Sequence, residues 1–295
     1  MNFNTAIQIA IGLMFVWITL AMFTSQIQEW IASILSWRAK MLEDAIGNIL
    51  GNPELHNQFY EHPIVKGLYT TSGKRKPGGI PSDKFALVLY EMVMDAGKTT
   101  GEIKSSFDAL QKGVASLKGQ KGFEQVAGSL NTLLIGIEER TDKTLDAAAE
   151  SRKRIEGWFN DSMDRLGGAY KRRVQIVTII VGILLAAVVN ADTFAIIDKL
   201  WRDPLIREAL VAQASNFKLP AQGEAQSPIE AIPGYADQLN SLSLPLGWGK
   251  ENIPATPAEW PQKFLGILLS GVAAAQGAPF WFDLMRKLVR PAPAK

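Results

Sequence analysis

Residues 155–201 read IEGWFNDSMDRLGGAYKRRVQIVTIIVGILLAAVVNADTFAIIDKLW, and this stretch decides the fold. It begins with apolar residues at helical spacing, passes through Lys171-Arg172-Arg173, and continues as an apolar run without a charge before Asp192. About 20 apolar residues suffice to cross a hydrocarbon core of about 30 Å. The stretch therefore predicts one long helix that leaves a soluble helical region and enters a membrane.

Two further runs are long and apolar enough to cross a bilayer. They are TAIQIAIGLMFVWITLAMF at 5–23 and FLGILLSGVAAAQGAPFWF at 264–282, and neither carries a charge. We expect transmembrane helices at residues 1–24, 174–197 and 262–283. The first run lacks a basic N-terminal region and a small-residue cleavage site, so we interpret it as a retained anchor and not as a signal peptide.

Basic residues gather beside one end of each expected span. They include Arg38 and Lys40 after the first span, Arg154, Arg165 and Lys171 to Arg173 before the second, and Arg286, Lys287, Arg290 and Lys295 after the third. Short loops rich in Lys and Arg stay in the cytoplasm. We therefore expect the N-terminus outside and both residues 38–173 and the C-terminus in the cytoplasm.

The remaining segments differ in composition, and together they predict an all-α membrane protein. We expect an amphipathic helical extension at 25–50, a cytoplasmic helical region at 51–173, an extracytoplasmic proline-rich segment at 198–261 and a cytoplasmic basic tail at 284–295. Within the cytoplasmic region, apolar spacing predicts helices at 82–95, 102–118, 122–139 and 142–173. Proline and glycine predict an irregular loop at 51–81. The first helix either continues to about residue 50 or bends at the membrane interface.

The chain offers little material for catalysis or for metal binding. Its 295 residues include no cysteine and only two histidines, His56 and His62, at a spacing that matches no zinc site. The triplet Gly97-Lys98-Thr99 is preceded by Met92 where a phosphate loop needs glycine. We expect no catalytic residue, no cofactor, no metal and no nucleic-acid partner, and hence no enzyme.

Polar residues in or near the expected spans are the remaining candidates. Gln8, Asn190, Asp192 and Gln276 could line a pore, or they could form hydrogen bonds between helices. Small residues recur every four positions in the third span, at Gly266, Ser270, Ala274 and Ala278. Such a row allows close approach of another helix, either within the subunit or between subunits.

Several segments resemble a group of uncharacterised bacterial inner-membrane proteins. They include IEGWFNDSMDRLGGAYKRR at 155–173, VVNADTFAIIDKLWRDPLIREAL at 188–210, LPLGW at 244–248 and GAPFWFDLMRKLV at 277–289. EWIASILSWRAKMLEDAIGNIL at 29–50, HPIVKGL at 62–68 and IPSDKFALVL at 80–89 belong to the same set. The resemblance implies a bacterial inner-membrane location and a shared three-span architecture, and it implies no catalytic residues.

The leading hypothesis is an oligomeric membrane scaffold or assembly subunit without catalytic activity. Its expected partners are membrane lipids, further copies of the chain and a cytoplasmic protein, because its amphipathic helices expose apolar stripes that need cover. The alternative is an ion or small-solute channel formed between subunits. A third alternative is a membrane enzyme, for which only the acidic group Glu156, Asp161 and Asp164 could supply chemistry.

Overall fold

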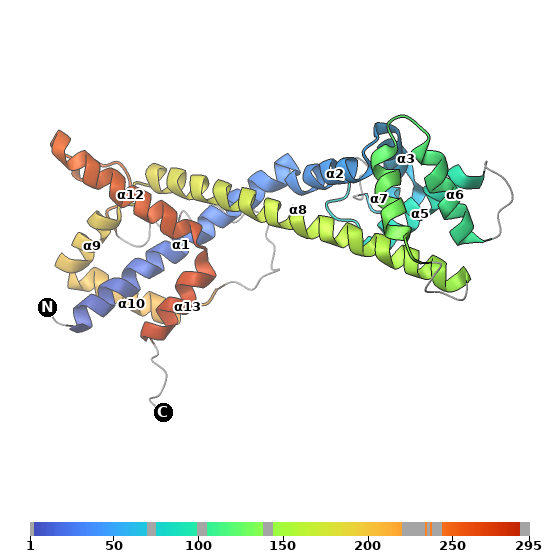
Figure 1. Ribbon diagram of the computed structural model, residues 1–295. Coiled ribbons are helices and arrows are strands. Elements are labelled where there is room, and N and C mark those ends of the chain that lie inside the picture. Colours follow the sequence, from blue (N-terminus) through green and yellow to red (C-terminus); the bar gives the residue numbers. More distant parts are fainter. Residues whose placement is uncertain are drawn as a thin grey trace, which may run out of the picture. The chain divides into compact units, whose positions relative to one another are not determined.

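The computed structural model describes residues 3–69, 75–98, 105–137, 144–219, 234, 237 and 244–289 (Figure 1). These residues form twelve α-helices and two short 3-10 helices, and no strand occurs among them, which confirms the all-α prediction. The chain divides into two compact units. Unit 1 comprises 1–35 and 172–295, and unit 2 comprises 36–171.

The helices have the following bounds. Unit 1 contains α1 (Phe3–Leu35), the C-terminal part of α8 (Thr144–Val188), α9 (Thr193–Arg202), α10 (Pro204–Asn216), α12 (Trp260–Ala275) and α13 (Ala278–Val289), with 3-10 helices η1 (Lys250–Asn252) and η2 (Pro257–Glu259). Unit 2 contains α2 (Trp37–Leu50), α3 (Pro53–Glu61), α4 (Pro63–Lys66), α5 (Ser82–Lys98), α6 (Ser106–Lys118), α7 (Glu124–Leu134) and the N-terminal part of α8.

Helix α1 is the centre of unit 1. Most of its side chains between Ile9 and Phe23 are buried, because α9, α10, α12 and α13 all contact it. A helix that is apolar on every face needs such cover, from protein or from lipid. Among the described residues, α1 is also the one unbroken helix that is long and apolar enough to cross a membrane. Up to three spans result if each of two bent helix pairs counts as one.

Both of those pairs interrupt a span that we predicted as one helix. Helix α8 ends at Val188, and α9 continues at an angle of 52°, so the predicted span 174–197 is bent near its outer end. The predicted span 262–283 breaks at Gln276-Gly277, where α13 turns by 96° away from α12. Gly277 has a φ of +88°, which glycine adopts without strain, and Pro279 cannot donate the hydrogen bond that would continue the helix.

The helix pair α12–α13 does not extend the full length of the second span. A Cβ built on Gly182 lies 3.6 Å from the backbone nitrogen of Ala275, so α12 ends beside Gly182 of α8. At about 1.5 Å per residue, Gly182 lies roughly 14 Å along α8 from Arg173, which is about half of the roughly 30 Å that a span would need to cross. Beyond the break, α13 packs along α1.

The course of α13 bears on the predicted topology, which itself stays a prediction. Residues 214–219 at the end of α10 line one pocket together with Phe282, Met285, Arg286 and Val289 of α13. The sequence predicts that residues 214–219 lie outside the membrane and that the residues of α13 beyond 283 lie in the cytoplasm. Residues that share a pocket cannot lie on opposite sides of a hydrocarbon core of about 30 Å. The cause is the break at Gly277, which the apolar composition of 264–282 conceals.

Unit 2 has its own hydrophobic core around three phenylalanines. The rings of Phe85 and Phe159 stack with centroids 4.1 Å apart, and Phe59 lies 5.3 Å from Phe85. Helices α5 and α6 touch backbone to backbone at Gly113, since a Cβ built there would lie 1.9 Å from the carbonyl oxygen of Val93. The unit therefore keeps a packed core that does not depend on apolar surroundings.

Several predicted boundaries in unit 2 change. The first helix does not continue to residue 50, because Ser36 takes a left-handed conformation between α1 and α2. The loop predicted at 51–81 contains α3 and α4, each capped by a side chain, from Asn52 and His62, and begun by proline. The predicted helices at 102–118, 122–139 and 142–173 are α6, α7 and α8, although parts of these ranges (102–104, 138–139 and 142–143) lie outside the described residues.

Candidate functional site

The junction of α8 and α9 carries the densest group of buried polar side chains in unit 1. Asn190 has a φ of +52°, a left-handed conformation that asparagine tolerates better than most residues, and it ends α8. Its Nδ2 donates a 2.7 Å hydrogen bond to the carbonyl oxygen of Gly247. The backbone N–H of Gly247 donates in return to Val189, and the Trp248 Nε1 donates to Ala187. The segment LPLGW thus docks on the broken end of α8.

Asp192, which follows the break, forms an ion pair with Lys263 of α12. Its Oδ2 lies 3.5 Å from Lys263 Nζ, and the two side chains are only 8% and 6% exposed. The other carboxylate oxygen accepts a 2.9 Å hydrogen bond from the N–H of Phe194 and so caps α9. Burial of two charges is tolerated here because each has an opposite partner.

The row of small residues on α12 lies against this polar group. A Cβ built on Gly266 would lie 1.8 Å from Asp192 Oδ1, so only glycine leaves room for the carboxylate. One turn later, the hydroxyls of Ser270 and Thr193 share a 2.8 Å hydrogen bond. Ala274 and Ala278, the remaining members of the row, are buried in the same unit. The row therefore makes close contacts within the subunit; whether it also contributes to a contact between subunits stays open.

Gln8 and Gln276, the other two polar candidates, lie apart from this junction. The Gln8 Oε1 accepts a 3.1 Å hydrogen bond from Nε of Arg207 on α10. Arg207, which is 8% exposed, also donates to the carbonyl oxygen of Leu200. Gln276 is exposed and lies at the α12–α13 break. The structure thus distributes the predicted pore residues over three places instead of bringing them together.

The sequence analysis missed two of the residues that complete these sites. Lys263 stood at the edge of the third predicted span, and Arg207 stood in the proline-rich segment that we predicted outside the membrane, in a stretch expected to form a short helix. A lone cation beside an apolar run often extends its head group to the membrane surface, and no pattern in the sequence marks Asp192 and Gln8 as the respective partners. The packing of α9 on α12 brings Asp192 and Lys263 together, and the packing of α10 on α1 brings Arg207 and Gln8 together.

The polar contacts described above hold the helices of unit 1 to one another. Among the described residues, no group of three or more His, Asp or Glu side chains could hold a metal ion. The buried polar side chains named above bond to each other or to backbone groups of the same unit. The Oδ1 of Asn190 is an exception, since it is buried and has no hydrogen-bond partner within the part of the chain that is described.

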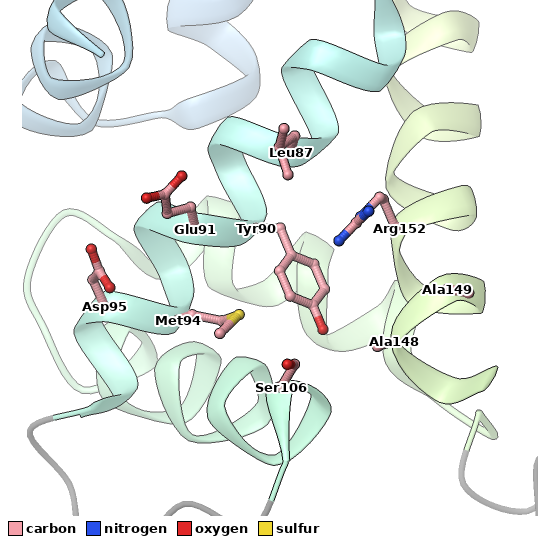
Figure 2. A pocket seen from close by; sticks show the side chains of 9 residues that line it. All are labelled: Leu87, Tyr90, Glu91, Met94, Asp95, Ser106, Ala148, Ala149 and Arg152. Carbon is pink, nitrogen blue, oxygen red and sulfur yellow. The ribbon is translucent and has the colours of Figure 1, made fainter. Parts of the chain in front are cut away.

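Unit 2 presents an open pocket of about 460 Å³ between α5, the start of α6 and α8. Leu87, Met94, Ala148 and Ala149 form its apolar floor. Figure 2 shows Arg152 reaching from α8 toward the Tyr90 ring, whereas Glu91 and Asp95 lie together at the other edge of α5. The pocket therefore combines an apolar floor with a positive rim and a negative rim.

Tyr90 is the most deeply placed polar side chain of this pocket. The residue is 3% exposed, and its hydroxyl has no hydrogen-bond partner among the described atoms. Burial raises the pKa of the Tyr90 phenol, although the nearby Ser151 hydroxyl and Arg152 guanidinium act in the opposite direction. The Arg152 guanidinium lies 5.5 Å from the ring centroid. A neutral phenol at this depth can donate a hydrogen bond to a group that enters the pocket.

The histidines that the sequence singled out have local roles, and the acidic group lies within a continuous helix. His62 Nδ1 accepts a 3.3 Å hydrogen bond from Ile64 and caps α4, while its Nε2 lies 3.4 Å from Glu91. His56 contacts the Tyr60 ring. Helix α8 runs unbroken through the acidic group at 156–164 and through Gly157, Gly167 and Gly168. The triplet Gly97-Lys98-Thr99 lies at the end of α5, and Thr99 is outside the described residues.

Comparison of the chain with protein-family models, with curated proteins and with solved structures finds no match.

Proposed function

We propose that the protein is an oligomeric, non-enzymatic scaffold of the bacterial inner membrane. Unit 1 is the membrane anchor, and unit 2 binds a cytoplasmic protein. The observation that carries the proposal is the internal pairing of polar side chains in unit 1, at Asp192–Lys263, Thr193–Ser270 and Gln8–Arg207. Side chains that serve as helix-to-helix contacts stabilise an anchor, whereas a pore needs polar groups that face a continuous water path.

In the proposed topology, α1 and α8 cross the membrane and α12–α13 enters and returns on one side. Three observations support it: the 96° bend, the end of α12 beside Gly182, and the pocket shared by α10 and α13. Both termini then lie outside, and residues 36–171 lie in the cytoplasm with their many basic residues. A broken helix is tolerated at this depth when protein surrounds its free backbone groups.

The oligomer forms through the outer face of α8. Ile176, Ile180, Leu184 and Val188 recur every four residues there, and each is more than half exposed. Gly182, between them in sequence, contacts α12 instead. In this proposal α8 of a second subunit covers the stripe, and the exposed leucines of α12 face lipid.

The partner binds at the Tyr90 pocket of unit 2. Its docking segment presents an apolar side chain for the floor and charged groups for Arg152 on one rim and Glu91 on the other, while Tyr90 donates a hydrogen bond. This chemistry is typical of a peptide segment that anchors by one buried side chain.

Site-specific photo-crosslinking in intact membranes tests the partner proposal. A photoreactive amino acid at position 152 should give one discrete crosslinked product, and the same group at Lys153, its exposed neighbour that does not line the pocket, should not. Equal products at both positions, or none at 152, would contradict the proposed docking site.

Reconstitution in liposomes tests the channel alternative. The proposal predicts no conductance above that of protein-free liposomes for the full chain. Currents that change on Asp192→Ala or Gln276→Leu would instead support a pore. Asp192 is held by Lys263 and Phe194, so its replacement should affect stability and leave the liposome current unchanged.

A further inference from the structure

Unit 1 has a pocket of about 450 Å³ where the end of α10 meets α13. Its floor is aromatic and apolar. The Phe217 ring packs edge to face on Phe15 of α1 and lies 6.1 Å from the Phe282 ring, and Met285 is 1% exposed. These contacts fix the floor on three helices, so the pocket is part of the folded unit.

The charged side chains that line this pocket are all basic. Lys218 and Arg286 line it, and no acidic residue does so among the described residues. The Arg286 guanidinium lies 5.7 Å from the Phe282 ring, which holds it over the apolar floor. Neither cation has a carboxylate within 4.0 Å in the part of the chain that is described. Two cations above an apolar floor, without a carboxylate partner among the described residues, are complementary to an anion that carries an apolar tail.

Helix α13 also carries an exposed apolar stripe that is suited to lipid. Phe280, Leu284 and Leu288 recur every four residues on α13 and are exposed. Arg286 lies on the opposite side of the helix, and Lys287 borders the apolar stripe. A short helix with this division is typical of helices that lie in the membrane interface, with the apolar side among acyl chains and the basic side among head groups.

We propose that this pocket binds one anionic phospholipid. The phosphate and acidic head group contact Lys218 and Arg286, and the first part of an acyl chain lies on Phe217, Phe282 and Met285. A zwitterionic lipid fits less well, because its own cation lies close to its phosphate and meets the two basic side chains. The site goes beyond the scaffold role, since it does not depend on the partner or on the number of subunits.

Native mass spectrometry of the full chain from nanodiscs tests the site. The nanodiscs contain equal amounts of phosphatidylglycerol and phosphatidylcholine. The wild-type protein should retain one phosphatidylglycerol in preference to phosphatidylcholine. Lys218→Gln and Arg286→Gln should each lower the retained fraction by roughly fivefold, the effect expected for one basic residue near an anionic lipid.

Lys287→Gln is the matched control, because Lys287 adjoins Arg286 on α13, is exposed, and does not line the pocket. It removes the same charge and should leave lipid retention unchanged. Equal losses for Arg286→Gln and Lys287→Gln would show that the surface charge attracts lipid without a site. Retention that excess inorganic phosphate abolishes would show that the pocket takes a free anion, and no preference in the wild type would overturn the proposal directly. Unchanged thermal unfolding of the three variants establishes that each is folded.

Discussion

Replacement of Lys263 by methionine should destabilise unit 1 strongly. The change removes the only basic partner that Asp192 has among the described residues and leaves Asp192, which is 8% exposed, as a buried charge. Removing one partner of a buried ion pair costs about 3–5 kcal/mol. The 3.5 Å distance between Lys263 Nζ and Asp192 Oδ2 is longer than that of a strong charge-assisted hydrogen bond, which is about 2.7–2.9 Å. We therefore expect a loss of about 3 kcal/mol in unfolding free energy, at the lower end of this range.

The compensating variant isolates the cause. Asp192→Asn keeps an oxygen that accepts from the N–H of Phe194 and removes the charge, so the double variant Asp192→Asn/Lys263→Met should recover to within about 1 kcal/mol of the wild type. Lys250→Met, an exposed lysine in the same unit, serves as the control and should change stability by less than about 0.5 kcal/mol.

Thermal unfolding of the purified full chain in nanodiscs measures these differences. About 3 kcal/mol corresponds to a fall in Tm of roughly 6–12 °C for a unit of this size. If Lys263→Met unfolds at the wild-type temperature, the pair does not stabilise the helix junction. If the double variant is no more stable than Lys263→Met, methionine damages the packing of α12, and our electrostatic reasoning is wrong.

Three further predictions concern packing, pH and topology. Gly266→Ala should destabilise unit 1 by more than about 2 kcal/mol in thermal unfolding, because its Cβ would lie 1.8 Å from a carboxylate oxygen of the ion pair. Gly128→Ala is the control and should be neutral or slightly stabilising, because nothing lies within 4 Å of the added Cβ. Equal effects of the two changes would refute this reasoning. Burial, reinforced by nearby acidic groups, raises the pKa of Tyr60 well above its ordinary value. Folding therefore favours its neutral form. This contribution to stability is fully present below the ordinary phenol pKa of 10.0 and is lost as the pH rises further. The wild type should lose stability above that pH more steeply than Tyr60→Phe, and parallel stability curves would contradict the prediction. The chain has no cysteine, so Lys218→Cys and Arg286→Cys each give a protein with a single labelling site. A membrane-impermeant thiol reagent should modify both sites from the same side of sealed vesicles. Labelling from opposite sides would support the three-span topology instead.

The sequence predicted the elements of this fold better than the places where they break. Apolar runs mark the membrane candidates, and the apolar spacing of 155–170 marks the helix that leads into the second. The break at Asn190 could not be predicted from its neighbours. Its left-handed conformation is held by a hydrogen bond to Gly247, which lies far along the chain. The break at Gly277 had a local signal, glycine followed by Pro279, but hydropathy alone outweighed it.

The candidate site was predicted only in part, for a physical reason. Asp192, Gly266 and Ser270 were recognised as residues of interest, yet their common location follows from the packing of α9 on α12. Composition shows that an acid and a lysine are present, and it does not show that they meet. The same limit applies to Tyr90 and Arg152, which the apolar pattern of α5 and the charge pattern of α8 do not connect.

The mass of the purified full chain in nanodiscs tests the central claim most directly. One chain has a mass of 32.3 kDa. The account predicts a single protein mass at one whole-number multiple of that value greater than one, and replacement of Leu184 by glutamate on the exposed stripe of α8 should reduce it to the monomer. A monomer for the wild-type chain would contradict an oligomeric scaffold.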